Sequence, residues 1–176
     1  MKLTVAWLKK QVACSDGVDW FMAFGKTDSV EVMNCLLEAK KHDWANWLIV
    51  RLLDRKNHIR YAIFAAEQVI DVFEKKYPED KRPRLAIDAA KAVLENDTEA
   101  TRNAAGAAWD AAWAAWTSGD AAGDAARAAG NAARAAWADW AAEDAARAAW
   151  AAGDAGSAMK EKIIRYGLEL HVKGER

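Results

Sequence analysis

The sequence predicts an all-α protein, and its composition and periodicity both support this fold class. Of the 176 residues, 42 are alanine, the strongest helix former, whereas only 10 are glycine and two are proline. We expect seven to nine helices, no β-sheet, and closely packed antiparallel alanine-rich helices in the C-terminal half. The chain is expected to form one domain, with an amphipathic half (1–97) and an alanine- and tryptophan-rich half (98–176).

Two short helices are expected at the N-terminus. Apolar residues in 4–13 share one broad face, and the Ser-Asp-Gly sequence at 15–17 interrupts this pattern. The second helix is expected to begin at Asp16 and to end near Gly25.

Aspartate residues indicate where the next two helices begin. Asp28 stands three residues before Glu31 and ahead of an apolar periodic run, which is the spacing of a capping box. A helix is therefore expected over 29–40. Asp43 is expected to cap the following helix, DWANWLIVRLL (43–53).

The remaining helices of the first half are delimited by proline. Apolar residues at helical spacing predict one helix over 56–76, which Pro78 ends. PEDKRP (78–83) is expected to be an exposed loop. Pro83 suits the first turn of the next helix, and the composition changes after Glu95.

Residues 104–158 hold 29 alanines in 55 positions. Most of this tract repeats in blocks of seven such as AAGDAAR and AAGNAAR. At 100° per residue, block positions 1, 2, 5 and 6 fall within an arc of about 140°, so one helix face is nearly pure alanine. An alanine face lets helices approach closely, whereas tryptophan, arginine and aspartate share the opposite face.

The alanine-rich tract cannot form one continuous helix. One helix over 107–154 would extend about 70 Å at about 1.5 Å per residue, too long for a compact domain of this size. TSGD (117–120) and GDAGS (153–157) supply residues that stop and cap helices. A block one residue short at 135–140 is compatible with a kink or bulge. The final helix is expected over 157–171.

Charge and cysteine content exclude several classes of protein. The chain has 25 basic and 26 acidic residues, so the basic excess typical of nucleic-acid binding is missing. Two cysteines and three scattered histidines predict neither a disulfide framework nor a zinc site, and no cofactor is expected. No signal peptide or membrane-spanning run is recognisable, so we expect a cytoplasmic protein.

Sequence motifs for catalysis are missing as well. The chain contains no glycine-rich phosphate loop, HExxH, CxxC or GxSxG motif. Asp54 and His58, four residues apart on one expected helix, resemble an acid/base pair, but charged helix surfaces often produce such pairs. The sequence therefore predicts that the protein is not an enzyme.

Arginine and tryptophan together form the unusual chemical feature of the chain. Guanidinium groups bind phosphate or carboxylate through paired hydrogen bonds, and indole rings offer a flat surface for a base. One interpretation is a site for a small anionic, nucleotide-like ligand, formed by Arg127, Arg134, Arg147, Trp137, Trp140 and Trp150. The alternative is structural: the tryptophans fill the core, and two of the arginines, Arg127 and Arg147, pair with the aspartates three residues earlier, Asp124 and Asp144.

A likeness to known proteins extends over nearly the whole chain and is carried by ACSDGVDWF (13–21), DWANWLIVRLL (43–53), RYAIFAAEQVIDVFEKKYPEDKRPRLAIDAAKA (60–92), the alanine/tryptophan tract and KEKIIRYGLEL (160–170). In these stretches the chain resembles a family of bacterial and prophage immunity proteins associated with polymorphic toxins. The resemblance implies a small helical protein that binds and blocks a toxin. Occurrence in prophages leaves a counter-defence role open, and no catalytic residues are implied.

Two functional hypotheses follow. In the first, an inhibitor covers a protein partner with a patch in 28–60 or 76–84, using Asp43, Trp44, Trp47, Arg51 and Arg55. In the second, a phage or prophage sponge sequesters a nucleotide-like immune signal in a pocket that holds at least two of the three arginines, with their aspartate partners absent or displaced. A structural module without a ligand, and a homo-oligomer, both stay open.

Overall fold

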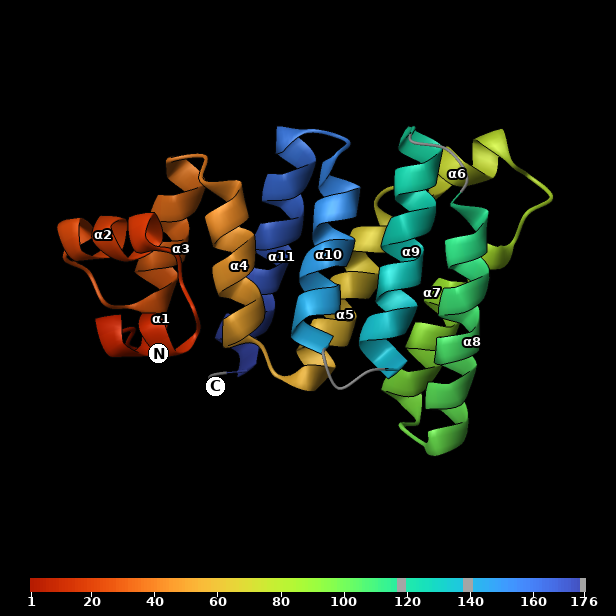
Figure 1. Cartoon of the computed structure of the whole chain (residues 1–176), viewed down its shortest axis with the longest axis horizontal. Helices are drawn as coiled ribbons and strands as arrows, with labels where there is room; N and C mark the ends of the chain where they lie inside the picture. The colour runs from red at the N-terminus through yellow and green to blue at the C-terminus, as the bar shows by residue number, and fades with distance from the viewer. Residues whose placement is uncertain (117–119, 138–140, 175–176) are drawn as a thin grey trace.

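The computed structural model describes residues 1–116, 120–137 and 141–174, and these residues form helices without a β-strand, which confirms the all-α prediction (Figure 1). The helices in the described ranges are α1 (Val5–Lys10), α2 (Ser15–Phe24), α3 (Ser29–Glu38), α4 (His42–Leu52), α5 (Arg55–Glu67), α6 (Ile70–Lys76), α7 (Arg82–Glu95), α8 (Glu99–Ala115), α9 (Ala121–Trp137), α10 (Ala141–Gly153) and α11 (Ser157–Gly174). None of these helices has the length and apolar character needed to cross a bilayer.

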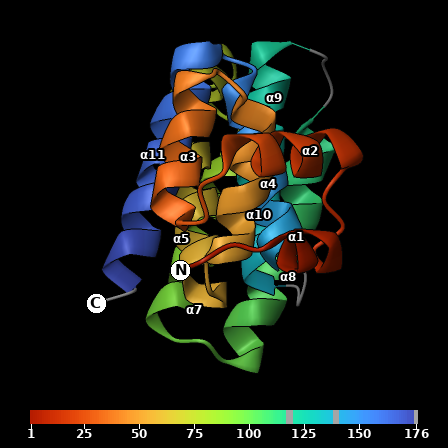
Figure 2. The same cartoon turned by 90° about the vertical axis from the view of Figure 1, so that its left-hand side faces the viewer.

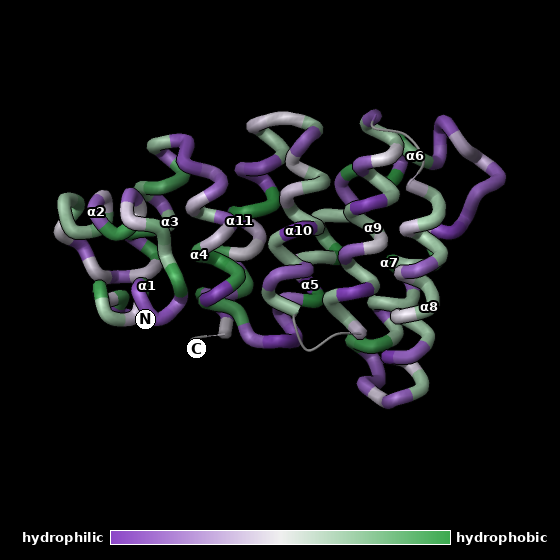
Figure 3. The backbone as a smooth tube through the Cα atoms, viewed as in Figure 1, coloured by the Kyte–Doolittle hydropathy of each residue, from purple (hydrophilic) through white to green (hydrophobic). Residues whose placement is uncertain are grey.

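The helices are arranged in two layers (Figures 1 and 2). One layer, called here the outer layer, contains α4, α10, α9 and α8 side by side, and the other contains α11, α5 and α7. Helices α1, α2 and α3 stand at one end of the array, and α6 packs on α9. The connection between α6 and α7 is strongly hydrophilic, in agreement with the exposed loop expected there (Figure 3).

Alanine allows α9 to be the most enclosed helix of the array. It packs against α5, α6, α7, α8 and α10, and nearly every alanine along it is buried. Small side chains permit this because the distance between helix axes is set by the side chains at the contact. The predicted packing through alanine faces is therefore confirmed for α9 and α10. On α8 the face is buried only in part, at Ala112 and Ala115, whereas Ala107 and Ala114 are exposed.

Leucine at Ala125 or Ala132 should destabilise the protein by roughly 1–3 kcal/mol, because both alanines are fully buried and a larger side chain would overpack the contact. Urea unfolding followed by circular dichroism measures this change. Ala114→Leu on the exposed side of α8 is the matched control and should change the free energy of unfolding by less than about 0.5 kcal/mol. Equal stability of the two buried variants and the wild type would contradict the packing.

Several predicted helix ends are confirmed. The Asp28 carboxylate accepts hydrogen bonds from the backbone N–H groups of Val30 and Glu31, and so caps α3. Gly25 ends α2 in the left-handed conformation, where glycine carries no Cβ penalty. Pro83 lies in the first turn of α7.

The number of helices was predicted wrongly, since the described residues contain eleven rather than seven to nine. One extra break divides the segment 56–76 into α5 and α6. Val69 leaves the helical conformation at φ −127° and ψ −7°, and the Gln68 amide donates to the Phe64 carbonyl. The break lets both Val69 and its neighbour Ile70 be buried.

The other extra break lies in the alanine-rich tract. Helix α9 ends at Trp137 and α10 begins at Ala141. The kink or bulge expected at the short block 135–140 falls partly on 138–140, which lie outside the described residues. The breaks expected near 117–120 and 153–157 are also present between helix ends, although 117–119 lie outside the described residues.

Asp43 was predicted to cap α4, and this prediction is wrong. The helix begins at His42, with Lys41 in the N-cap position and no side-chain capping bond. Asp43 instead lies in the first turn, where its negative charge suits the helix dipole. Its carboxylate accepts a hydrogen bond from the Trp150 indole, so a contact between distant segments replaces the local cap.

Candidate functional site

The outer layer carries most of the arginine and tryptophan residues that the sequence singled out. Helices α5 and α7 pack behind α9, so the partly exposed Arg127 and Arg134 lie on the side of α9 that faces away from them. We call this surface the tryptophan–arginine face; it comprises Trp47, Arg51, Trp109, Trp113, Trp116, Arg127, Arg134, Trp137, Arg147 and Trp150. Two parts of it are described in turn.

The first part is a groove of about 370 Å³ between α4 and α10. The Arg51 guanidinium lies 4.0 Å from the centre of the Trp47 ring and donates to the Trp47 carbonyl at 2.8 Å. On the other side, the Trp150 indole N–H donates to Asp43 at 3.3 Å. The groove thus combines residues predicted as partner-binding with residues predicted as ligand-binding.

A buried polar relay fixes the position of α4 against α10. Asn46 on α4 donates to the Ala146 carbonyl on α10 at 3.1 Å, and its oxygen accepts from the Tyr61 hydroxyl on α5 at 2.9 Å. Tyr61 is fully buried, and burial raises the pKa of its hydroxyl above the usual range. Since the Asn46 amide, the Ala146 carbonyl and the Tyr61 hydroxyl all have hydrogen-bond partners inside the protein, α4 and α10 are held in one arrangement and so is the groove between them.

The second part is a row of indole rings along α8 and α9, called here the tryptophan ladder. Trp109 stacks on Trp137 with ring centres 6.1 Å apart and also contacts Trp113, which meets Trp116 edge to face at 4.8 Å. The Trp137 ring lies directly over Gly106, where a Cβ would come within 3.2 Å of it. Three of these rings, Trp113, Trp116 and Trp137, are exposed, so they are not core filler.

All three candidate arginines are paired with aspartates. Arg127 binds Asp124 at 2.6 Å and Asp154 at 2.9 Å. Arg147 binds Asp144 at 3.1 Å, so the pairing predicted at a spacing of three residues is present in both cases. Arg134 has Asn131 three residues earlier and reaches across to Asp144 on α10 at 3.3 Å instead.

Asp144 is the buried charge of this region. It is fully buried between two arginines, and burial nevertheless raises the pKa of its carboxyl because desolvation outweighs the attraction of Arg134 and Arg147. An aspartate whose pKa is raised by folding binds its proton more tightly in the folded state. Its contribution to stability is therefore present below the unfolded pKa of about 3.9 and is lost as pH rises through the folded value.

Asp144→Asn should accordingly be tolerated at pH 7. Asparagine keeps an oxygen for Arg147 and removes the desolvated charge, so the variant is expected to equal or exceed the wild type in stability at neutral pH. Below about pH 4 the difference should disappear. Thermal unfolding across this pH range is the measurement; a loss of roughly 3–5 kcal/mol at pH 7, typical of a broken buried ion pair, would contradict it.

Other predicted site residues lie outside these two parts. Arg55 donates to the carbonyl of Ala136, near the end of α9, at 2.9 Å. Its guanidinium also lies 3.9 Å from the carboxylate of Asp97. Trp44 lines an apolar pocket between α1, α2, α3 and α4, together with Asp43 and Trp47. Trp140 lies outside the described residues.

The side chains of Asp54 and His58 make hydrogen bonds to other residues and not to each other in the part of the chain that the structure describes. The Asp54 carboxylate accepts the Asn57 N–H and caps α5, while the buried His58 ring bonds the Val50 carbonyl. Burial lowers the pKa of His58 from its usual value. Both residues thus have structural partners, and no cluster of three or more metal-binding side chains occurs among the described residues.

Sequence reasoning missed Glu143 and Lys160 beside the α4–α10 groove. Glu143 lines the groove and lies near enough to Arg51 to act on its charge, and Lys160 approaches Asp43 at 3.7 Å. Glu143 follows two alanines at the tryptophan position of the repeat, and this departure from the pattern was the available signal. No local signal marks Lys160, because its role depends on where α11 packs.

One family model matches the part of the chain that carries most of the tryptophan–arginine face. The model of the family described as "Imm-5 like putative immunity protein" matches residues 49–142, more than half of the chain. The chain belongs to this immunity-protein family. The match extends from α4 to the start of α10 and includes the tryptophan ladder, Arg51, Arg127 and Arg134. No curated protein and no solved structure matches the chain.

Proposed function

We propose that the protein is a non-catalytic inhibitor that neutralises a protein partner, a toxin or a defence component, by covering it with the tryptophan–arginine face. Membership of the immunity-protein family supports a neutralising role. The likeness to bacterial and prophage immunity proteins suggests polymorphic-toxin immunity as the setting, inside the cytoplasm. Family membership implies a protein partner, and the balanced charge of the chain disfavours a nucleic acid.

The observation that carries this proposal is the exposure of tryptophan beside arginine on one layer. Trp113, Trp116, Trp137 and Trp150 are all exposed although tryptophan is among the most apolar side chains. Tryptophan and arginine are the residues most enriched in the energetic centres of protein interfaces. A cluster of exposed apolar rings with charged residues around it is typical of a protein-binding surface.

The rigidity of the face also suits inhibition. Arg51 is held over Trp47, and Arg134 lies 5.1 Å from the Trp109 ring centre, so these long side chains are ordered before binding. Pre-ordered side chains lose less entropy when a complex forms, which raises affinity. The fixed α4–α10 contact adds to this effect.

The nucleotide-sponge alternative stays a prediction. It requires at least two of Arg127, Arg134 and Arg147 to exchange their aspartate partners for a ligand. No specific observation favours that exchange over the pairs seen in the structure. We therefore propose only the protein-binding function.

The test is neutralisation of a toxin candidate encoded beside the gene. The candidate is expressed in bacteria with the wild-type protein or with a triple variant, Trp113→Ala, Trp137→Ala and Trp150→Ala, and survival and co-purification are measured. The wild type should rescue growth and form a complex, whereas the folded triple variant should do neither. Equal rescue by both proteins, or a toxin that is neutralised without forming a complex, would refute the proposal.

A further inference from the structure

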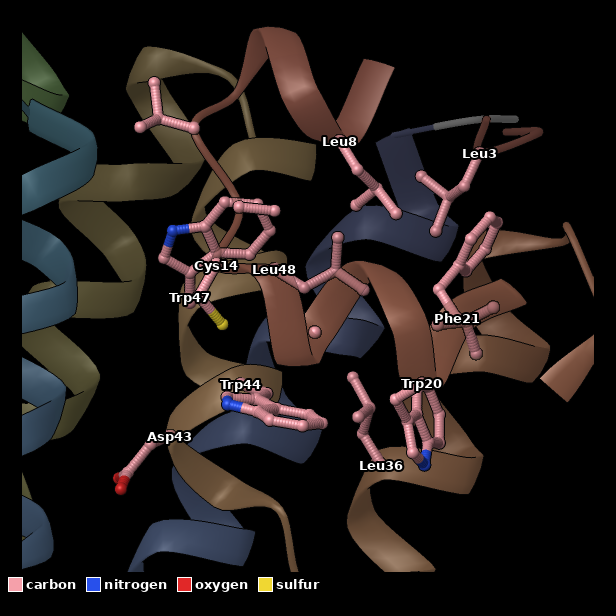
Figure 4. Close-up of a pocket in the computed structure, with 14 residues that line it drawn as sticks. Leu3, Leu8, Cys14, Trp20, Phe21, Leu36, Asp43, Trp44, Trp47 and Leu48 are labelled. Carbon is pink, nitrogen blue, oxygen red and sulfur yellow. The ribbon is translucent and has the colours of Figure 1, made fainter. Parts of the chain in front are cut away.

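Helices α1 to α4 enclose an apolar pocket at the end of the array (Figure 4). Its volume is about 280 Å³, and Asp43 is the one charged residue among those that line it. Trp20, Leu36 and Trp44 form one wall, and the Asp43 carboxylate points away at the outer edge. All the residues that line the pocket precede the segment that matches the immunity-protein family, which begins at residue 49.

The walls of the pocket are pre-formed. Trp20 meets Trp44 edge to face at 6.2 Å and stacks on Phe24 at 5.2 Å, so neighbouring rings fix its position. Leu36 is buried and lies between the two tryptophans. A pocket with rigid, almost wholly apolar walls gives water few hydrogen-bonding partners, and such cavities bind apolar molecules instead.

The pocket opens at the connection between α1 and α2. Val12 and Cys14 both line it and are exposed, Val12 to 84%. Val12 has a φ of 59°, a rare conformation for a β-branched residue, and the backbone bonds of Val12 to Lys9 and of Ala13 to Leu8 hold it. A small molecule therefore has a route from solvent to the apolar walls.

We infer that this pocket binds a small uncharged hydrophobic molecule built on a bicyclic ring system. An apolar cavity of about 150 Å³ in another protein binds benzene, and this pocket has nearly twice that volume. A charged group would lose its water in the pocket without gaining a partner, because the walls are apolar and the Asp43 carboxylate points away from them. The ligand is thus a neutral hydrophobe, and its binding does not depend on the proposed inhibitory function.

Two dyes that differ by one sulfonate test this inference on the intact protein. N-phenyl-1-naphthylamine is neutral, whereas 8-anilinonaphthalene-1-sulfonate carries a negative charge on the same rings. The neutral dye should bind at one saturable site with a dissociation constant below about 100 µM and blue-shifted emission. The sulfonated dye should bind at least about ten-fold more weakly, which corresponds to about 1.4 kcal/mol.

A pocket-filling variant locates the dye. Leu36→Phe places a larger ring between the two tryptophans and should weaken binding of the neutral dye at least about ten-fold. Leu85→Phe, at an exposed position of α7, is the control and should leave the binding unchanged. Circular dichroism and thermal unfolding establish that both variants are folded. Unchanged binding by folded Leu36→Phe, or equal binding of the two dyes, would place the dyes on the exposed tryptophans and overturn the inference.

Cys14 provides a readout that needs no pocket variant. Its exposed thiol lines the pocket, so a saturating amount of the neutral dye should slow its reaction with 5,5′-dithiobis(2-nitrobenzoate) several-fold. The half-buried Cys35 does not line the pocket and should react at the same rate with and without dye. Peptide mass spectrometry separates the two thiols. An unchanged rate at Cys14, or no saturable dye binding at all, would also overturn the inference.

Discussion

Replacement of Trp150 by alanine should weaken binding of the neutralised partner by about thirty-fold or more while the helical fold persists. The side chain is 52% exposed, so its loss removes little from the protein's own core. Its indole N–H is held by Asp43, which orders the ring before binding. Energetic centres of interfaces cost at least about 2 kcal/mol on truncation, and about 1.4 kcal/mol is ten-fold in affinity.

Titration calorimetry with the purified partner measures this effect, and the unfolding temperature of the variant establishes that it is folded. Leu85→Ala is the matched control, because Leu85 is an exposed apolar residue on α7, in the other layer. Its affinity should equal that of the wild type. A loss of affinity in Leu85→Ala with none in Trp150→Ala would place the interface on the opposite layer.

Replacement of Gly167 by alanine should cause a large loss of stability, roughly 1–3 kcal/mol. A Cβ at this position of α11 would come within 2.8 Å of both Ile49 on α4 and the Tyr61 ring on α5. Both neighbours are fully buried, and Tyr61 is also tied to Asn46 by its hydroxyl. Neither can move without disturbing the packing of three helices.

Gly130→Ala on α9 is the control for this prediction. A Cβ there would meet no atom nearer than the Ala112 Cβ at 3.5 Å, which is an ordinary van der Waals contact. The variant should therefore keep its stability or gain roughly 0.5–1 kcal/mol, because alanine is the better helix former. Urea unfolding of both variants is the measurement, and similar losses in the two would show that backbone effects rather than the Tyr61 contact decide stability.

The sequence predicted the features that depend on local spacing. The seven-residue alanine blocks made the buried faces of α9 and α10 recognisable, because periodicity alone decides which side of a helix is apolar. Asp28 and Gly25 act within one turn of the chain, so their roles as caps followed from the residue types. The Asp124–Arg127 and Asp144–Arg147 pairs follow from the same short spacing.

The rest of the candidate site depends on which helices lie side by side. The groove exists because α4 packs on α10, about one hundred residues later, through the bond from Asn46 to Ala146. No local pattern in either segment encodes that pairing. The same holds for Arg134, whose partner Asp144 is supplied by another helix. The pocket between α1 and α4 likewise required the packing of four helices.

Oxidative footprinting of the complex tests the central claim most directly. Brief exposure to hydroxyl radicals oxidises exposed indole rings and methionine sulfur, and peptide mass spectrometry reads each position. Binding of the partner should protect Trp113, Trp137 and Trp150 and leave the exposed Met22 on α2 as reactive as before. Full reactivity of the three tryptophans in a complex that still neutralises its partner would show that the tryptophan–arginine face is not the inhibitory surface.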